Sequence, residues 1–404
     1  MKHRIVFDRA EKCLETEDVL ALIGPRQAGK TTVLRYLENV LTAHDRKVTY
    51  FTLEEKDYLD ELNKDPKNLF KIFPVSKDSR HYFLIDEIQY LADPTHFLKL
   101  LYDLHRKNIK LIVTGSSAFY MDRKFKDSLA GRKKILPVYP LGFRDFLTFK
   151  DRGELSKYLP GSLSMPDPEN VPLSLKKEME HLYFDYLIYG GYPKVVLMQE
   201  IQEKKDELRE IGLSYLKKDI LEAGIKNENA YYKVIHMLAD SPGALVNSSE
   251  LASTVRVSQT AIDHYLWVAQ KAFHFALIKP FFNNLRKELT KMPKVYFYDP
   301  GLRNYFARNF EPLVVRRDKG ELLENGVFRQ LLEFFDLDQV QFWRTADGNE
   351  VDFIVDEQYA IEVKYSESAY RESKYRKFRE LYPSIPLRLT SMDVEKVAYP
   401  AWLL

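Results

Sequence analysis

The sequence predicts an α/β protein whose N-terminal part is built on a parallel sheet. Compact apolar runs at residues 18–23, 48–53, 81–88 and 109–117 alternate with stretches of helical apolar spacing, such as 31–44. Runs of this kind fit strands that are buried on both faces, and their alternation with helices is typical of a parallel sheet. We therefore expect helices on both sides of this sheet.

The remainder of the chain has a different order of elements. Residues 153–174 contain four prolines and two glycines and are expected to form a linker. Residues 174–240 have a helical pattern that is broken at 190–193, and residues 241–282 contain two short helices and a β-rich tail. From about residue 320 the expected order is helix, three strands, helix and strand.

Length and composition exclude several classes of protein. A chain of 404 residues is too long for one small core and predicts two or three domains. Its net charge of +2 gives no overall field for a nucleic acid, so that any basic surface must be local. The single cysteine, Cys13, cannot form an internal disulfide. Without a signal peptide or an apolar run near the roughly 20 residues that span a bilayer, a cytoplasmic protein with no membrane contact is expected.

A phosphate-binding motif, G-x-x-x-x-G-K-[ST], spans residues 24–31 between an expected strand and an expected helix. Its glycines let backbone N–H groups surround phosphate oxygens at a helix N-terminus. Lys30 would contact the β- and γ-phosphates of a nucleotide, and Thr31 would coordinate Mg²⁺. The candidate nucleotide-binding residues here are Gly24, Pro25, Arg26, Gln27, Ala28, Gly29, Lys30, Thr31 and Thr32.

Two adjacent acids at the end of the third apolar run supply the second half of this site. Asp86 can hold Mg²⁺ through water, and Glu87 can polarise the attacking water. The fourth run ends in small hydroxyl residues. If its strand lies between the other two, Thr114 or Ser116 would reach the γ-phosphate, although simple strand termination explains these residues too. Arg132 would reach the γ-phosphate within one subunit or from a neighbour in a homo-oligomer, or it is a structural arginine.

These segments resemble a known family. GPRQAGKTT, FLIDEIQ, VTGSS, LAGR and YPLGFRDF, in this order, are similar to AAA-type P-loop ATPases that are widespread in archaea and bacteria as uncharacterised ATP-binding proteins. The resemblance continues through YGGYPKVV, KKDI, KVYFYDPGLRNYF, LLENGVF and EVDFIV…IEVKYS, and so covers nearly the whole chain. It implies an AAA/ASCE-type P-loop domain at 1–150, a linker and helical lid at 151–240, a winged helix-turn-helix at 241–293 and a restriction-endonuclease-like α/β domain at 294–404.

A helix–turn–helix pattern supports the implied winged helix. Ser258 is a candidate N-cap, and Leu251, Val257, Ile262 and Leu266 form the apolar face. In a DNA complex the second helix would present Gln259, Thr260 and His264 to the major groove. Residues 271–319 carry 11 lysines and arginines against 4 acids, which favours DNA contact. The alternative is a packing or protein-contact module.

An acidic cluster near the C-terminus resembles the D…ExK signature of restriction endonucleases. Asp352, Glu362 and Lys364 fall on two expected strands, with Glu324 as the extra acid on a preceding helix. Asp352 and Glu362 could share a second Mg²⁺ or Mn²⁺, while Lys364 activates the attacking water. The alternatives are an internal salt bridge to Lys364 and an inactive nuclease fold that serves as a scaffold. The basic residues at 371–379 could contact phosphates.

The leading functional hypothesis is an ATP-hydrolysing, DNA-associated protein in which nucleotide state controls a winged helix and a nuclease-like domain. In this hypothesis Lys30 and Glu87 serve ATP hydrolysis, and Asp352, Glu362 and Lys364 serve strand cleavage. The alternative is a regulatory NTPase switch or a protein-remodelling ATPase with a non-catalytic C-terminal domain. DNA-stimulated ATP turnover would distinguish the two.

Overall fold

The computed structural model describes residues 1–76, 79–115, 129, 131–161, 171–281, 292–395 and 397–404. These residues form two compact units. The N-terminal unit contains residues 1–140 with 271–273, and the C-terminal unit contains 141–270 with 274–404.

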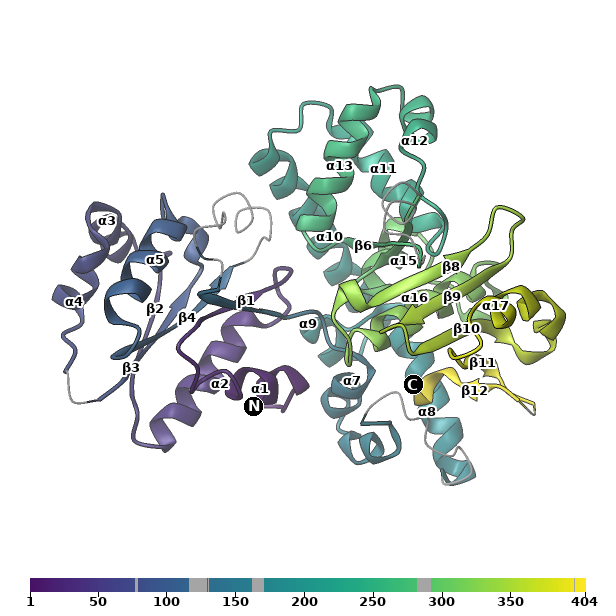
Figure 1. Cartoon of the computed structure of the whole chain (residues 1–404), viewed down its shortest axis with the longest axis horizontal. Coiled ribbons are helices and arrows are strands. Elements are labelled where there is room, and N and C mark those ends of the chain that lie inside the picture. The colour runs from purple at the N-terminus through teal and green to yellow at the C-terminus, as the bar shows by residue number, and fades with distance from the viewer. Residues whose placement is uncertain (77–78, 116–128, 130, 162–170, 282–291, 396) are drawn as a thin grey trace. The chain divides into compact units, whose positions relative to one another are not determined.

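The N-terminal unit is built on a parallel five-stranded sheet (Figure 1). The spatial order is β2–β3–β4–β1–β5, and every neighbouring pair runs parallel. The strands are β1 (Val19–Ile23), β2 (Lys47–Thr52), β3 (His81–Asp86), β4 (Ile109–Gly115) and β5 (Lys133–Pro137). The helices are α1 (Ile5–Glu11), α2 (Lys30–Ala43), α3 (Lys56–Lys64), α4 (Leu69–Ile72) and α5 (Pro94–His105), with 3₁₀ turns η1 (Pro66–Asn68) and η2 (Ile88–Tyr90).

Both faces of this sheet are covered, as the sequence predicts. Every residue of β1, β3 and β4 is buried. Side chains alternate along a strand, so that Ala21 and Ile85 pack in one core with α5, while Leu22 and Leu84 pack in a second core with α2. The β4 strand lies between β1 and β3. The ends of these three strands therefore converge at one edge of the sheet.

The C-terminal unit begins with a helical segment. Its helices are α7 (Phe143–Phe149), α8 (Leu173–Tyr189), α9 (Pro193–Leu197), α10 (Ile201–Ala223), α11 (Glu228–Asp240), α12 (Ser248–Val255), α13 (Gln259–Lys271) and α15 (Pro300–Ala307). Two strands, β6 (Phe275–Ile278) and β7 (Lys294–Phe297), form an antiparallel pair. Because β7 begins at Lys294, this pair joins the segment expected to be the winged helix to the segment that follows it.

The last part of the chain forms a second five-stranded sheet in the order β12–β11–β10–β9–β8. The β8, β9 and β10 strands are antiparallel, whereas β10, β11 and β12 run parallel. The expected order of helix, three strands, helix and strand is confirmed, and β12 is an addition. The elements are α16 (Lys319–Leu331), β8 (Val340–Arg344), β9 (Glu350–Val355), β10 (Tyr359–Ser366), η9 (Glu372–Tyr375), α17 (Arg376–Leu381), β11 (Leu387–Asp393) and β12 (Tyr399–Pro400).

Candidate nucleotide-binding site and carboxylate cluster

The phosphate-binding motif forms the loop between β1 and α2. Gly29 precedes α2 with φ +93°, a conformation that residues with a Cβ rarely adopt. Gly24 packs so closely that an added Cβ would lie 2.0 Å from the carbonyl oxygen of Val138. The two glycines therefore set the path of the loop into the N-terminus of α2, where the backbone N–H groups favour an anion.

Lys30 lies at the start of α2 and is 5% exposed. Its Nζ donates to the carbonyl oxygens of Gly24, at 3.0 Å, and Pro25, at 2.7 Å. Burial lowers the pKa of Lys30 to about 8, even though the charges of Glu87 and Asp86 act in the opposite direction. A buried ammonium whose hydrogen-bond partners are carbonyls suits an incoming anion.

Asp86 is buried at the end of β3 and collects hydroxyl groups from three elements. Its Oδ2 accepts from Thr31 Oγ1 at 2.8 Å and from the Tyr50 hydroxyl at 3.1 Å, and its Oδ1 accepts from Thr114. Burial and the charge of Asp86 raise the pKa of Tyr50 to about 12. A carboxylate beside a hydroxyl at a phosphate-binding loop is a donor set that fits Mg²⁺.

Glu87 follows in a left-handed conformation, with φ +59°. Its backbone N–H donates to Thr114 Oγ1 at 2.9 Å, and its carboxylate accepts from Gln89. A non-glycine residue with positive φ is uncommon and is held in place by such contacts. Thr114 is buried at the end of β4 and contacts both acids. Ser116 lies outside the described residues.

One residue of this site was missed by sequence reasoning. Arg4, which is 3% exposed, donates from Nη1 to Ala28 O at 2.6 Å and from Nη2 to Tyr139 O at 2.9 Å. It thereby ties the phosphate-binding loop to the segment after β5. No motif or periodicity surrounds Arg4 that could have identified it.

Arg132 forms a half-exposed ion pair with Asp103 at 2.8 Å, which agrees with a structural role.

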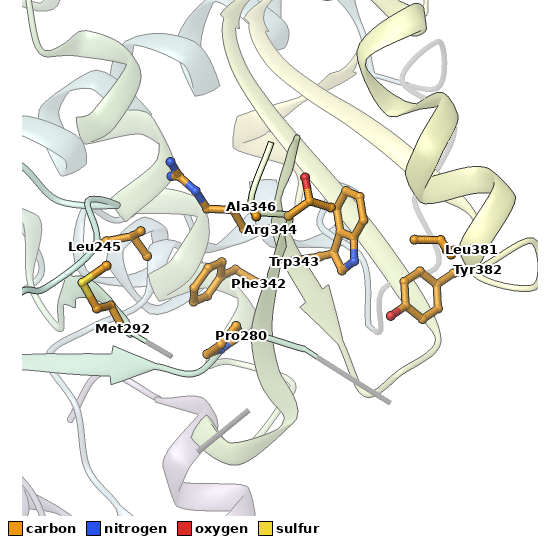
Figure 2. Close-up of a pocket in the computed structure, with 10 residues that line it drawn as sticks. Leu245, Pro280, Met292, Phe342, Trp343, Arg344, Ala346, Leu381 and Tyr382 are labelled. Carbon is orange, nitrogen blue, oxygen red and sulfur yellow. The ribbon is translucent and has the colours of Figure 1, made fainter. Parts of the chain in front are cut away.

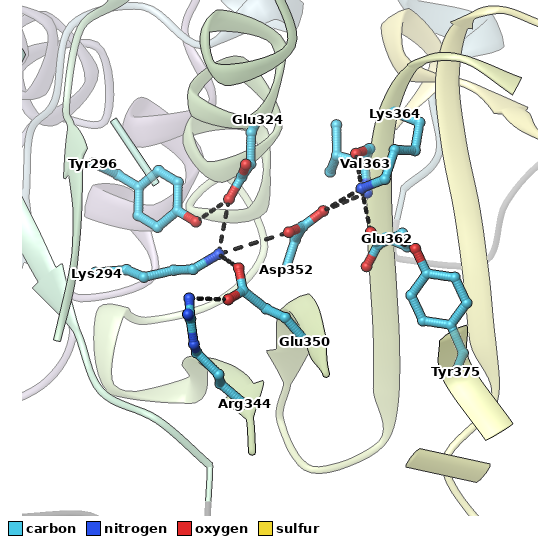
Figure 3. A network of polar contacts seen from close by, with 10 residues as sticks. All are labelled: Lys294, Tyr296, Glu324, Arg344, Glu350, Asp352, Glu362, Val363, Lys364 and Tyr375. Atoms are coloured by element: carbon cyan, nitrogen blue, oxygen red, sulfur yellow. Dashed lines mark hydrogen bonds and ion pairs between the residues drawn. The ribbon is translucent and has the colours of Figure 1, made fainter. Parts of the chain in front are cut away.

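The C-terminal unit brings the predicted acidic residues together (Figure 3). We call Glu324 on α16, Glu350 and Asp352 on β9, and Glu362 on β10 the carboxylate cluster. Asp352 Oδ2 accepts from Val363 N–H at 2.9 Å and lies 3.6 Å from Lys364 Nζ. Lys364 also donates to Glu362 Oε1, which the Tyr375 hydroxyl approaches to 2.7 Å. Burial and the charge of Asp352 raise the pKa of Glu362 and of Glu324.

Lys294 corrects the expectation for the basic segment 271–319. It is 1% exposed, and its Nζ lies among carboxylates of the cluster. Arg303 is also buried, with Nη1 2.5 Å from Asp318 Oδ2, and Arg316 is paired with the same acid. Neither Lys294 nor Arg303 can meet a DNA phosphate without leaving its ion pairs. The local charge excess is therefore in part internal, because long basic side chains can be buried when acids pair with them.

The second divalent cation implied by the endonuclease resemblance does not fit this donor set well. Lys294 and Lys364 already contact the carboxylates that would hold it. Within the described ranges, no group of three or more His, Cys, Asp or Glu side chains is arranged to hold a metal ion. The internal salt bridge to Lys364 is present.

The helix–turn–helix segment has the capping that the sequence predicts. Ser258 Oγ accepts from Ala261 N–H at 3.2 Å, and Leu251, Ile262 and Leu266 are buried. Gln259, Thr260 and His264 are exposed on α13. His264 lies against Trp267, with ring centroids 6.2 Å apart. The exposed side chains of α13 include Asp263 but no lysine or arginine.

An apolar cavity of about 600 Å³ lies in the C-terminal unit (Figure 2). Arg344 lines this cavity and also pairs with Glu350 at 2.7 Å. The Phe342 ring, another part of the lining, lies 5.5 Å from Lys294 Nζ. The remaining lining residues are Leu245, Pro280, Met292, Trp343, Thr345, Ala346, Leu381 and Tyr382.

Comparisons with known proteins divide the chain into three regions. Residues 16–147 match the family model of an AAA domain. Residues 180–313 match a domain of unknown function, DUF8612, and residues 319–396 match another, DUF4143. No helix in the described ranges combines the length and apolar character needed to cross a bilayer.

Several relatives match most of this chain at low identity. An uncharacterised protein of Haemophilus influenzae is 28% identical over 88% of this chain and 83% of its own length. Uncharacterised proteins of Methanocaldococcus jannaschii and Mycobacterium tuberculosis are 24% and 25% identical, over 98% and 90% of this chain and 86% and 74% of their own lengths.

The solved structures to which the chain is similar include the following two. A Thermotoga maritima RuvB variant has 15% identity and a TM-score of 0.31, over 71% of this chain and 92% of that chain. The replication initiator DnaA bound to AMPPCP and single-stranded DNA has 17% identity and a TM-score of 0.32, over 66% and 86%. These TM-scores are too low to support a further argument. The sheet order, the phosphate-binding loop and the family match agree, and residues 16–147 are an AAA-type P-loop domain.

Proposed function

We propose that this protein binds ATP with Mg²⁺ at the loop between β1 and α2 and hydrolyses it. One observation carries the proposal: Lys30 is buried with carbonyl partners, directly beside the Thr31–Asp86 hydrogen bond. An ammonium ion of this kind gains its strongest partner when a phosphate enters the loop. The matching AAA domain supports ATP as the nucleotide.

The side chains around the loop divide the work of hydrolysis. Lys30 and the first N–H groups of α2 hold the β- and γ-phosphates. Thr31 and Asp86 would hold Mg²⁺, which supplies positive charge to the phosphate oxygens as charge develops. Glu87 orients the attacking water and accepts its proton. Thr114 keeps both acids in register, because its hydroxyl contacts Asp86 and the backbone of Glu87.

Two substitutions test the proposal. The Lys30→Ala variant should lose binding of a fluorescent ATP analogue, because the buried ammonium group of the loop is removed. The Glu87→Gln variant should bind the analogue normally but hydrolyse ATP at least ~100-fold more slowly, the order expected for loss of a general base. Analogue affinity and phosphate release are the two measurements.

A matched control separates a local effect from unfolding. Lys110 is another buried lysine of the N-terminal unit, and its Nζ contacts Thr16 and the carbonyl oxygen of Asp18, away from the loop. The Lys110→Met variant should retain nucleotide binding. Unchanged affinity in a folded Lys30→Ala variant would contradict the proposal.

DNA association is a second candidate, favoured by an exposed basic strip on η9 and α17. Arg371, Lys374, Arg376, Lys377 and Arg379 are all exposed there. Three of them pair with surface acids, at 2.8 Å to Glu380, 2.7 Å to Asp347 and 2.5 Å to Glu372, and such exposed pairs are weak enough for a phosphate to replace. The winged-helix surface of Gln259, Thr260 and His264 is the competing contact.

Paired variants distinguish these two surfaces. Replacing Arg376 and Lys377 by Glu should weaken binding of labelled duplex DNA for all sequences and reduce its dependence on salt. Replacing Thr260 and His264 by Ala should reduce discrimination between sequences if α13 enters the groove. If neither pair changes a measured affinity, or if no DNA binding is detected, the regulatory-switch or remodelling hypothesis gains.

A further inference from the structure

Three carboxylates of the cluster converge on one ammonium group. Lys294 Nζ lies 2.5 Å from Glu350 Oε1, 3.2 Å from Glu324 Oε1 and 3.6 Å from Asp352 Oδ1 (Figure 3). These acids come from α16 and β9, whereas Lys294 comes from β7. The ammonium group therefore occupies the position of a divalent cation shared by these three carboxylates.

The position of Lys294 is fixed by its backbone. Lys294 pairs with Ile278 of β6 and forms an isolated bridge with Leu245, which precedes α12. Two residues further along β7, on the same face, the Tyr296 hydroxyl donates to Glu324. On the other side, a Cβ at Gly243 would lie 2.8 Å from Glu324 Oε1. The β6–β7 pair and the loop before α12 thus both close over Glu324.

The charges of the cluster are nearly balanced without a metal ion. Four carboxylates face Lys294, Lys364 and, through Glu350, Arg344. A divalent cation would add two positive charges beside two buried or half-buried ammonium groups, which is unfavourable where water screens little. One observation points the other way: Glu362 Oε2 is buried and has no hydrogen-bond partner among the described residues.

We infer that Lys294 takes the place of a divalent cation in the carboxylate cluster and docks the β6–β7 pair, with the helix–turn–helix before it, onto the last sheet. The cluster is then a closed ion-pair joint within the C-terminal unit, and the D…ExK residues Asp352, Glu362 and Lys364 serve this joint rather than metal-dependent cleavage. This inference is independent of ATP binding at the N-terminal unit.

Calorimetric titration of Mn²⁺ into the nucleotide-free full-length chain tests the inference. The wild type should take up no Mn²⁺ at the cluster, so that its isotherm equals that of the Asp352→Asn variant. The Lys294→Met variant should gain one Mn²⁺ site, and the added Asp352→Asn substitution should remove it. Lys110→Met is the control for loss of a buried lysine without carboxylate partners, and it should gain no site.

Two results would overturn the inference: Mn²⁺ uptake by the wild type that Asp352→Asn abolishes, and Mn²⁺-dependent DNA cleavage with the same dependence. If Lys294→Met does not fold, hydrogen exchange decides in the Glu324→Gln variant, which keeps the shape of the side chain but not its charge. Amides of β6 and β7 should then exchange at least ~10-fold faster, while those of β10 and β11 keep their rates. Unchanged exchange in β6 and β7 would show that the cluster does not hold them.

Discussion

Lys30 in the N-terminal unit and Lys294 in the C-terminal unit are both almost removed from water, and both lie beside acidic residues. Their immediate partners differ. Lys30 donates to two backbone carbonyls of its own loop, whereas Lys294 contacts three carboxylates from two other elements. The ammonium group of Lys30 can therefore still gain an anionic partner, whereas that of Lys294 already contacts three carboxylates.

The protonation behaviour of the two side chains follows from these partners. Burial lowers the pKa of Lys30 to about 8, because carbonyl dipoles replace lost hydration only in part. Burial acts on Lys294 in the same direction, but the charges of Glu324, Asp352 and Glu350 outweigh it and raise the pKa. A buried lysine with acids nearby in the fold is therefore available to bind a ligand only where those acids do not contact its ammonium group directly.

The largest difference is expected in stability. The Lys294→Met variant should lose about 3–5 kcal/mol in the free energy of unfolding of the C-terminal unit, because buried carboxylates are left without a counter-charge. The Lys30→Met variant should change the stability of its unit by less than about 1 kcal/mol, since no carboxylate loses a paired cation. Urea unfolding measures both free energies.

Each unit has its own reporter. The three tryptophans, Trp267, Trp343 and Trp402, all lie in the C-terminal unit, and the only cysteine, buried Cys13, reports on the N-terminal unit through thiol reactivity. Equal losses of unfolding free energy in the two variants would contradict the difference drawn between the two lysines.

A third buried lysine sharpens the comparison through pH. Burial lowers the pKa of Lys110 to about 8 from its ordinary value of 10.5. Between these values the unfolded chain holds more protons than the folded one, so the free energy of unfolding should rise with pH in this window. The gain from Lys110 approaches about 3 kcal/mol by pH 10.5. Cys13 reactivity at each pH, referred to the unfolded chain, should show a steeper rise in the wild type than in Lys110→Met, in which Lys30 still contributes. The same slope in both would contradict the assignment.

The path of the phosphate-binding loop depends on its glycines. In the Gly24→Ala variant the new methyl group would overlap the carbonyl of Val138, so the loop must shift. Displacement of this size should weaken ATP affinity by about 100-fold. Gly320, where an added Cβ meets nothing within 4 Å, provides the control, and Gly320→Ala should keep the wild-type affinity. Normal affinity in Gly24→Ala would mean that the loop does not need its observed path.

The smallest expected effect concerns Thr114, which touches no phosphate in the proposed mechanism. Thr114→Val keeps the shape of the side chain but removes the hydroxyl that contacts Asp86 and the backbone of Glu87. ATP hydrolysis should fall about 10- to 100-fold while affinity for ATP changes less than about threefold, since the acids are misplaced rather than lost. Single-turnover hydrolysis and equilibrium binding separate the two quantities. Equal losses in both would assign Thr114 to binding instead.

The sequence by itself determined the N-terminal sheet and the core of its site. Apolar runs such as 81–88, alternating with helices, predict strands buried on both faces, and a glycine-rich loop between strand and helix has few uses other than phosphate binding. Asp86 and Glu87 follow from the same logic, because residues that directly end a buried parallel strand must lie at the ligand-binding edge. Asp352, Glu362 and Lys364 were expected on adjacent strands and lie in contact there, whereas Glu350 of the cluster was not singled out.

Only the tertiary structure decided what neutralises each charged group. Lys294 is 30 residues from Glu324 and more than 50 from Glu350, and Arg4 reaches the phosphate-binding loop from outside any motif. Ion pairs and carbonyl contacts of this kind depend on distances between elements far apart in the chain, which composition and periodicity do not encode. Residues 271–319 do carry an excess of basic residues, but Lys294 and Arg303 are buried and do not form a basic surface. A sum of charges along the sequence does not show which of the charged side chains the fold buries.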